Sequence, residues 1–321
     1  MTPKARSSLV NGLTVFFLGL TGVALCLIPF RVLAAEVPKE RIAFGYTAIS
    51  PVMAGVWMAQ EIGAFEKHGL QVDLIYLRAG PLAVSGLVAG SLQAALGASN
   101  SVVSAIVAGA PIIAVAGATR YPGMSLWVRP EIQRPEQLEG QTIAVTRFGS
   151  TGDFVTRIIL KKLNLEGKVK LRQFGGQVEA DTAFRTKQVD ARGASSQKPT
   201  PDARELINAA DLKIPFDMDF LAVSNEFYNR SFSTVESIVR GYVVGIAALR
   251  ADKPRALEVL GKYMRARGGL VEENYQYAIR YLNPVPRVEP AAVETVLEML
   301  GKTSAAGLKI YDNSIIDRLV Q

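Results

Sequence analysis

Thr-Arg-Phe-Gly-Ser-Thr-Gly-Asp-Phe, residues 146–154, joins two segments of opposite pattern. The β-branched run 141–145 before it is typical of a strand. After it, apolar side chains recur at helical spacing from Phe154 to Leu163. The sequence therefore predicts a strand, a polar turn and a helix, which places free backbone N–H groups and small hydroxyls at a helix N-terminus.

Two interpretations of this turn are open. In the first, Ser150 or Thr151 caps the helix and Asp153 balances the helix dipole without any ligand. In the second, the turn binds an anion or a polar group of a ligand. Similar Gly/Ser/Asn-rich junctions at 47–51 and 98–101 also follow predicted strands. Three such junctions together favour the second interpretation.

The first 34 residues predict a cleaved signal peptide. Lys4 and Arg6 precede an uncharged apolar run from Leu9 to Phe30, and Val32-Leu33-Ala34-Ala35 offers small residues to a signal peptidase. A retained membrane anchor is the alternative, because the run is nearly long enough to span a bilayer. We expect cleavage near Ala34 and a soluble protein in the periplasm.

Composition narrows the possible chemistry. Cys26 and His68 are the only cysteine and histidine. A mature chain without cysteine has no disulfide and no cysteine metal site, and one histidine excludes sites that need two imidazoles. We therefore expect no catalytic residue, no metal and no cofactor. The formal net charge of +7 falls to +4 without Lys4, Arg6 and Arg31, and the scattered basic residues disfavour nucleic acid as a partner.

The residues after 34 predict an α/β protein large enough for two domains. Strands are expected at 41–46, 71–76, 93–97, 112–118, 125–130, 141–145, 170–174, 189–194 and 220–224. Helices are expected at 51–68, 81–89, 100–108, 134–140, 154–163, 179–186, 202–210, 235–249, 254–265, 271–281, 290–300 and 313–319. The first strand, helix and strand form a βαβ unit, which predicts a parallel sheet.

The segment between Arg78 and Arg120 contains no charged residue. A transmembrane hairpin is one interpretation, since residues 102–119 are nearly all apolar. However, Gly, Ser, Asn and Pro at 90–91, 99–101 and 109–111 divide the segment into short elements. We expect a buried α/β core, in which strands covered on both faces are continuous apolar runs.

Five segments carry a resemblance to a known family. They are Phe44-Gly45-Tyr46 with Ser50-Pro51, the run Glu-Ile-Gly-Ala-Phe-Glu-Lys-His-Gly-Leu at 61–70, Leu-Val-Ala-Gly-Ser-Leu-Gln at 87–93, Arg-Pro-Glu-Ile at 129–132, and 148–153. With them the chain resembles the substrate-binding proteins of ABC importers of the nitrate, sulfonate and taurine type, a fold shared with thiamine-pyrimidine synthases. The resemblance covers about residues 40 to 300.

The resemblance implies a type II periplasmic binding protein fold. Each of its two lobes is a mostly parallel sheet flanked by helices, and the ligand lies in the cleft between them. Lobe one is expected at 35–122 and 225–321, lobe two at 123–224, with crossovers near 120–128 and 218–225. The family usually has a small, apolar and Pro-rich loop after strand 189–194, whereas this chain has Arg192 and Ser195-Ser196-Gln197-Lys198. The class of ligand therefore stays open.

Ligands of open α/β sheets bind beyond the carboxyl ends of the strands, where the three junctions lie. A bidentate pair between Arg147 and a carboxylate or sulfonate is one expectation, and a solvated surface arginine is the alternative. The residues expected to bind ligand are Tyr46, Thr47, Ser50, Ser99, Asn100, Arg147, Gly149, Ser150, Thr151 and Ser195.

These observations predict a monomeric, non-catalytic solute-binding protein. It would capture a small anionic or polar organic solute and deliver it to an ABC permease and its ATPase, meeting the membrane only through the permease. One alternative is an enzyme on the same fold, similar to thiamine-pyrimidine synthases or dehydratases, with His68 as its reactive residue. The position of His68 at a predicted helix end disfavours it. The other is a sensory module that docks a receptor, which the sequence does not separate from a transport protein.

Overall fold

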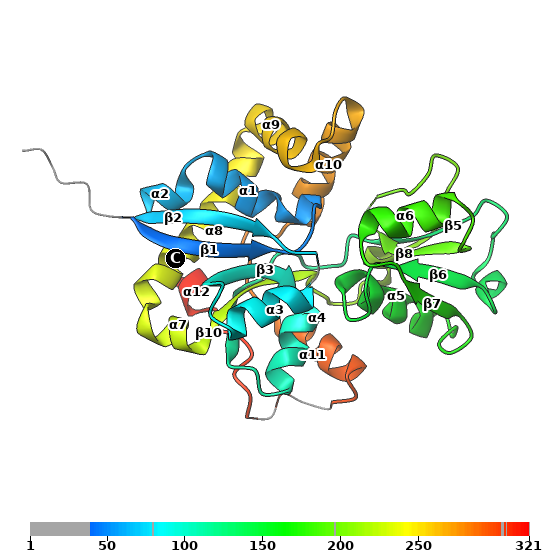
Figure 1. The fold of residues 1–321 in the computed structure, drawn as a ribbon, viewed down its shortest axis with the longest axis horizontal. Coiled ribbons are helices and arrows are strands. Elements are labelled where there is room, and N and C mark those ends of the chain that lie inside the picture. The colour runs from blue at the N-terminus through cyan, green and yellow to red at the C-terminus, as the bar shows by residue number, and fades with distance from the viewer. Residues whose placement is uncertain (1–38, 79, 196, 303–304, 306, 321) are drawn as a thin grey trace, which may run out of the picture. The chain divides into compact units, whose positions relative to one another are not determined.

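A computed structural model describes residues 39–78, 80–195, 197–302, 305 and 307–320. The predicted signal peptide, residues 1–34, lies outside them. The described residues contain two five-stranded sheets, each covered by helices (Figure 1).

The first sheet has the strand order β2-β1-β3-β10-β4. β1 pairs in parallel with β2 and β3, and β10 is antiparallel to β3 and β4. The strands are β1 (Glu40–Tyr46), β2 (Leu70–Tyr76), β3 (Ala94–Ala98), β4 (Ile112–Ala116) and β10 (Asp219–Ser224).

The second sheet has the order β7-β6-β8-β5-β9. β6 pairs in parallel with β7 and β8, and β5 is antiparallel to β8 and β9. The strands are β5 (Ser125–Val128), β6 (Thr142–Val145), β7 (Lys170–Gln173), β8 (Ala191–Ser195) and β9 (Arg204–Asn208).

Both sheets therefore share one plan, in which four strands run in the same direction and the fourth strand in the order runs the opposite way. That opposite strand is β5 where the chain enters the second lobe and β10 where it returns to the first. The predicted α/β fold with two sheets flanked by helices is confirmed, and each sheet is mixed rather than purely parallel.

Helices cover both sheets. Those of the first lobe are α1 (Ala54–Glu61), α2 (Ala64–Lys67), α3 (Gly80–Val88), α4 (Ser99–Val107), α7 (Asn225–Arg230), α8 (Phe232–Ala251), α9 (Lys253–Met264), α10 (Gly269–Tyr281), α11 (Pro290–Met299) and α12 (Ser314–Leu319). The second lobe has α5 (Thr151–Lys162) and α6 (Gln177–Arg185). Short 3₁₀ helices are η1 (Pro51–Met53), η2 (Pro135–Leu138) and η3 (Ala209–Leu212).

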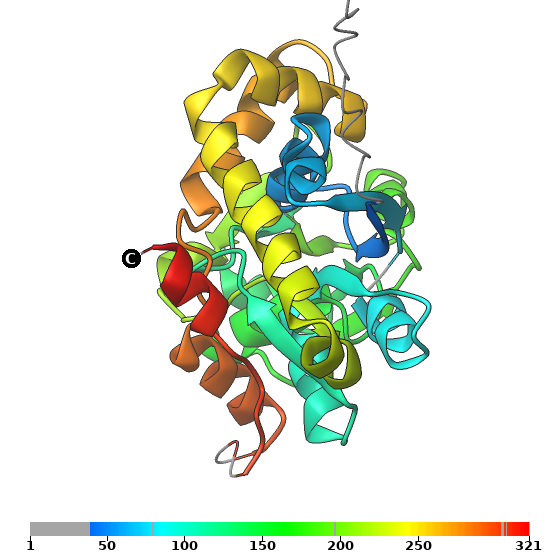
Figure 2. The ribbon, with the colours of Figure 1, turned by 90° about the vertical axis from the view of Figure 1, so that its left-hand side faces the viewer.

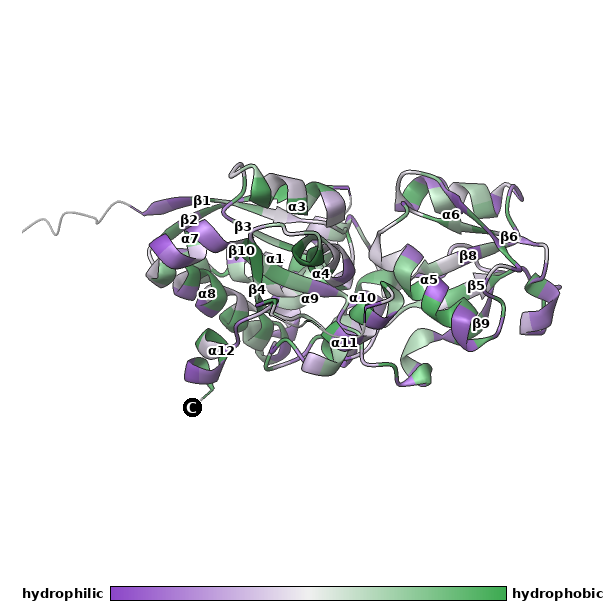
Figure 3. Ribbon diagram, turned by 90° about the horizontal axis from the view of Figure 1, so that it is seen from below, coloured by the Kyte–Doolittle hydropathy of each residue, from purple (hydrophilic) through white to green (hydrophobic). Residues whose placement is uncertain are grey.

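The uncharged segment lies in the core of the first lobe. Every residue of β3 and β4 is buried, and Figure 3 shows the strongly hydrophobic colour of α4 and β4. The transmembrane-hairpin interpretation is therefore wrong, because neighbouring strands and helices rather than lipid cover these apolar side chains.

The long helix α8 packs closely on α1. Among the described helices, α8 alone is long and apolar enough to cross a membrane by length and composition, and half of that stretch is buried. A Cβ added at Gly245 would lie 2.7 Å from the Ala59 amide nitrogen and even closer to the Gly55 carbonyl oxygen. The absence of a side chain at Gly245 thus lets the two backbones touch. Figure 2 shows α8 as one continuous helix across this side of the lobe.

Three sequence predictions need correction. The helix expected at 202–210 is strand β9 followed by η3, because residues 204–208 pair with the edge of β5. The helix expected at 51–68 divides at Gly63, whose φ of 66° breaks the helical path. The boundary of lobe two at 224 is wrong, since β10 hydrogen-bonds within the first sheet and the return crossover therefore precedes Asp219.

A buried carboxylate joins the two crossovers. The Asp217 carboxylate accepts hydrogen bonds from the backbone N–H groups of Ala118 (2.9 Å) and Thr119 (2.8 Å). The Thr119 hydroxyl in turn accepts the N–H of Met218 at 3.0 Å. Burial raises the pKa of Asp217 to about 8, although these N–H groups act to lower it. The contact fixes where the chain leaves the first lobe and where it returns.

Gly245→Ala tests the packing of α8 on α1. The added methyl group meets backbone rather than a movable side chain, so we expect a loss of about 3 kcal/mol in the free energy of unfolding. Gly261→Ala in α9 is the matched control, because its nearest neighbour would be 3.5 Å away. That change is expected to stabilise by up to about 1 kcal/mol. Equal denaturation midpoints for the two variants would contradict this packing.

Candidate functional site

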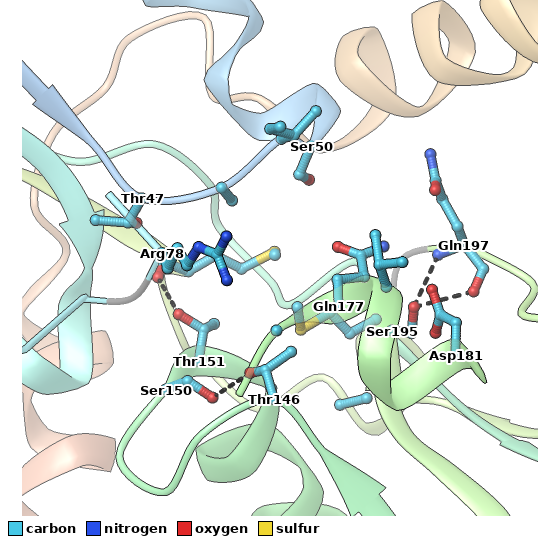
Figure 4. A pocket seen from close by; sticks show the side chains of 18 of the residues that line it. Thr47, Ser50, Arg78, Thr146, Ser150, Thr151, Gln177, Asp181, Ser195 and Gln197 are labelled. Carbon is cyan, nitrogen blue, oxygen red and sulfur yellow. Dashed lines mark hydrogen bonds between the residues drawn. The ribbon is translucent and has the colours of Figure 1, made fainter. Parts of the chain in front are cut away.

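A cavity of about 510 Å³ lies between the two lobes. Its walls are the carboxyl ends of β1, β2, β3, β6 and β8, together with the starts of the two antiparallel strands at Met124 and Asp219. The fold thus brings the strand ends of both sheets to one place, as the resemblance implied. Side chains enter the cavity from both lobes (Figure 4).

Five of the ten predicted ligand-binding residues line this cavity. Thr47 and Ser50 follow β1, Ser150 and Thr151 begin α5, and Ser195 ends β8. Figure 4 shows Thr47 and Ser50 on one wall, with Ser150 and Thr151 on another.

The other five predicted residues are absent from the cavity lining, and each has a partner elsewhere in the fold. Tyr46 packs edge-on against Trp57 in the core, with ring centroids 5.9 Å apart. Arg147 is exposed, and its Nε donates to the carbonyl of Gly175 at 3.0 Å. The Ser99 hydroxyl donates to the carbonyl of Asp217. A position near a helix terminus does not show whether a side chain points into the cavity or toward another part of the fold.

Asn100 and Gly149 contact each other across the lobes. The Asn100 amide donates to the carbonyl oxygen of Gly149 at 2.8 Å, and the Ser101 hydroxyl donates to the same oxygen at 3.0 Å. Gly149 has a φ of 80°, which glycine adopts readily. These residues therefore hold one lobe against the other instead of facing the cavity.

The start of α5 is an ordinary helix cap as well as a cavity wall. The Ser150 hydroxyl accepts the N–H of Asp153 at 3.4 Å and lies 2.8 Å from the Thr146 hydroxyl. The Asp153 carboxylate accepts the N–H of Gly149 at 2.9 Å and pairs with Arg157. Thr151 and Gly152 still border the cavity. Because Asp153 already balances the positive end of the helix, α5 attracts an anionic ligand less than a bare helix N-terminus.

Sequence reasoning missed the charged residues of the cavity. Arg192 is 2% exposed, donates from Nε to Asp181 at 2.7 Å and donates from Nη1 to the carbonyl of Gly193 at 2.8 Å. Arg78 lies 3.9 Å from Glu179 on the other lobe. Two signals were available, since Arg192 departs from the family pattern and Arg78 begins the uncharged segment.

Asp219 is the fifth charged residue of the cavity lining. Its side chain is only 4% exposed, and no ion pair among the described residues includes it. Burial raises the pKa of Asp219 to about 7, and the Thr47 hydroxyl partly offsets that rise. In the sequence, the one sign of this residue is its place directly before a predicted apolar strand.

Two buried polar atoms of the lining have no partner among the described residues. They are the Ser50 hydroxyl and the side-chain nitrogen of Asn274. The Asn274 oxygen is used, since it accepts from Gln197 of the other lobe at 3.1 Å. Burying a polar group without a hydrogen bond is costly, so both atoms are suited to a bound molecule.

Apolar side chains line the rest of the cavity. Met124, Met218 and Met264 supply flexible, polarisable surface, which suits an organic body of irregular shape. Ile49, Val178 and Leu270 line it while remaining exposed to solvent. Such a mixture of apolar walls and a few polar groups is typical of small-molecule sites.

The cavity shows no obvious catalytic or metal-binding set. Neither histidine nor cysteine occurs among its lining residues. His68 is the C-cap residue of α2 and is absent from that lining. In the part of the chain that the structure describes, no three His, Cys, Asp or Glu side chains group as metal ligands. What the arrangement can do is enclose and orient a small molecule.

Three solved structures with the same architecture are described as binding proteins. The aliphatic sulphonate-binding protein SsuA of Escherichia coli has a TM-score of 0.71 at 17% identity, covering 86% of this chain and 93% of that one. The alkanesulfonate-binding SsuA of Xanthomonas axonopodis pv. citri, bound to MOPS, has a TM-score of 0.69 at 18% identity, covering 83% and 92%. The nitrate-binding protein NrtA of Synechocystis PCC 6803 has a TM-score of 0.61 at 11% identity, covering 71% and 68%.

These similarities show that the chain has the periplasmic binding protein fold. None of the curated protein sequences compared with the chain matches it significantly. The family model described as NMT1/THI5 like matches residues 50–256, which is more than half of the sequence. The protein therefore belongs to the NMT1/THI5-like family.

Proposed function

We propose that the protein is an extracytoplasmic solute-binding protein of an ABC importer. The observation that carries this proposal is the cavity between two lobes of matching strand order, lined from both sides by polar and apolar groups. A volume of about 510 Å³ suits a small organic molecule. The sulfonate- and nitrate-binding proteins that share the fold support this proposal.

The contacts between the lobes support a cycle of opening and closing. Two sets of side-chain hydrogen bonds bridge the lobes, Gln197 with Asn274 and Asn100 and Ser101 with the Gly149 carbonyl. Side-chain hydrogen bonds of this kind contribute about 1 kcal/mol each, so they can form and break. Ligand that touches both lobes would shift the balance toward the closed form.

The proposed partners follow from this role. A permease and its ATPase would receive the solute from a monomeric protein in the periplasm. An ABC-type import component of Staphylococcus aureus with the same fold supports such an assembly. The enzymatic alternative gave the reactive role to His68, and His68 is absent from the cavity lining. A receptor in place of the permease is the sensory alternative.

A thermal-shift screen tests the binding function. Sulfonates, carboxylates, pyrimidines and amines are offered to the purified protein. A ligand at one hundred times its Kd stabilises the folded state by about 2.7 kcal/mol, which raises Tm by several degrees. Complete failure of the screen at saturating concentrations would count against the proposal.

Ser150→Trp is expected to abolish binding of any compound that raises Tm, because the indole ring fills the cavity. Loss of the cap should cost about 1 kcal/mol of stability and leave the fold intact. Ser85→Trp on the exposed surface of α3 is the control, with unchanged affinity expected. Calorimetric titration measures both variants. Unchanged affinity in a folded Ser150→Trp protein would remove this cavity as the site.

Asn100→Ala is expected to weaken binding although the side chain is absent from the cavity lining. Loss of its hydrogen bond to Gly149 makes the closed form less stable by about 1 kcal/mol, which raises Kd about fivefold. Asn229→Ala on the exposed side of α7 is the control. An Asn100→Ala protein with the Kd of wild type would show that these interlobe contacts do not contribute to binding.

A further inference from the structure

We propose that the solute carries a cationic nitrogen, a protonated amine or amidine, that binds Asp219. This inference rests on the proposed binding function and adds the chemical class of the ligand.

The charged side chains of the cavity favour a ligand with a positive group. Of its five charged side chains, Arg192 pairs with Asp181 at 2.7 Å, and Arg78 lies 3.9 Å from Glu179. Among the described residues, Asp219 has no cationic partner, so one negative charge is left over when its carboxylate is ionised. A ligand with one positive group would complete the balance.

The buried position of Asp219 at the edge of the cavity also favours a cationic group. It begins β10 between the two lobes, is 4% exposed and still borders the cavity. A carboxylate buried to this degree is costly unless a cation or several donors accompany it. The Thr47 hydroxyl is the one side-chain donor that acts on it. An ammonium group within hydrogen-bonding distance would supply the missing charge and donors together.

The other residues of the cavity lining favour the same class of ligand. The buried Arg192 is paired with Asp181, and Asp153 balances the start of α5. Arg78 is 66% exposed and its Nη1 lies 3.9 Å from Glu179 Oε1, so it is the one cation of the described lining within reach of an acidic group of the ligand. A plain anion would also meet the unpaired Asp219. The unpartnered Ser50 hydroxyl and Asn274 amide suit an acceptor atom of the ligand, and the methionines suit an apolar body. The ligand class is therefore an organic cation or zwitterion.

Matched pairs of compounds test this class. Benzylamine is compared with benzyl alcohol, benzamidine with benzamide, 4-aminobutyrate with butyrate, and 2-aminoethanesulfonate with ethanesulfonate. Affinities are measured by calorimetry at pH 8, where Asp219 is mostly ionised. In at least one pair, the member with the cationic nitrogen is expected to bind tenfold or more tightly than its twin.

Asp219→Asn links this preference to the carboxylate. It keeps the shape of the side chain and removes the charge, so the preferred cation should lose about 30-fold or more in affinity. Asp211→Asn, the same change at an exposed residue outside the cavity, is the control and should keep the preference. Circular dichroism confirms folding of both variants.

A pH series with the wild type is independent of any variant. The ligand amine stays protonated between pH 5.5 and 8.5, whereas Asp219, with a pKa of about 7, becomes ionised in this range. Affinity should therefore rise with pH and level off above pH 8, falling about tenfold per unit below pH 7.

Other titratable groups lie close to Asp219. Burial raises the pKa of Asp217 to about 8, and burial raises the pKa values of Tyr242 and Tyr277 well above the ordinary tyrosine value of 10.0. The two arginine–carboxylate pairs share the cavity. The Asp219→Asn variant separates the effect of Asp219 from the effects of these groups. If Asp219 alone causes the pH dependence, the affinity of this variant should not change with pH.

Two outcomes would overturn the inference. If every neutral or anionic compound binds as tightly as its cationic partner or more tightly, the binding function is supported and the proposal of a cationic ligand is wrong. Retention of the preference in a folded Asp219→Asn protein would remove Asp219 as its cause. If no compound of any charge binds, the proposed function falls, and this inference falls with it.

Discussion

The structure depends on one buried contact, in which the Asp217 carboxylate accepts the backbone N–H groups of Ala118 and Thr119. It joins the segment that leaves the first lobe to the segment that returns. Because β10 begins two residues later, the same contact sets the place of Asp219 beside the carboxyl ends of β1 and β3. The Thr119 hydroxyl adds a second link between the crossovers, because it accepts the N–H of Met218 at 3.0 Å.

The cavity contains charged and polar groups that are unfavourable to bury without a partner. Arg192 and Asp219 are charged side chains in buried strand positions, where an unpaired charge is strongly unfavourable. Asp181 satisfies Arg192, whereas no cation of the described chain satisfies Asp219. Functional sites are where a fold tolerates such a local cost, since a bound partner removes it. The buried Ser50 hydroxyl and Asn274 amide nitrogen also lack a hydrogen-bond partner within the described chain, and a bound ligand would supply one.

Much of the fold could be predicted from the sequence because its signals are local. The apolar strands and the polar turn at 146–154 indicate an α/β protein, and the strand and helix expected around that turn are observed as β6 and α5. Strand β9 was missed because its pairing with β5 is non-local and its own residues are mostly polar. Only five of the ten residues proposed to bind ligand line the cavity, for a similar reason. Junctions are visible in sequence, but whether Ser50 or Ser99 faces a cavity depends on the tertiary arrangement.

Native mass spectrometry of the protein recovered from its own periplasm without dialysis tests the central claim most directly. The account predicts one small molecule bound per chain, and accurate mass with fragmentation should identify a basic nitrogen in it. A bound molecule without such a nitrogen would contradict the role given to Asp219. A protein that carries no molecule, even after incubation with periplasmic extract, would contradict the account of the cavity as a solute site.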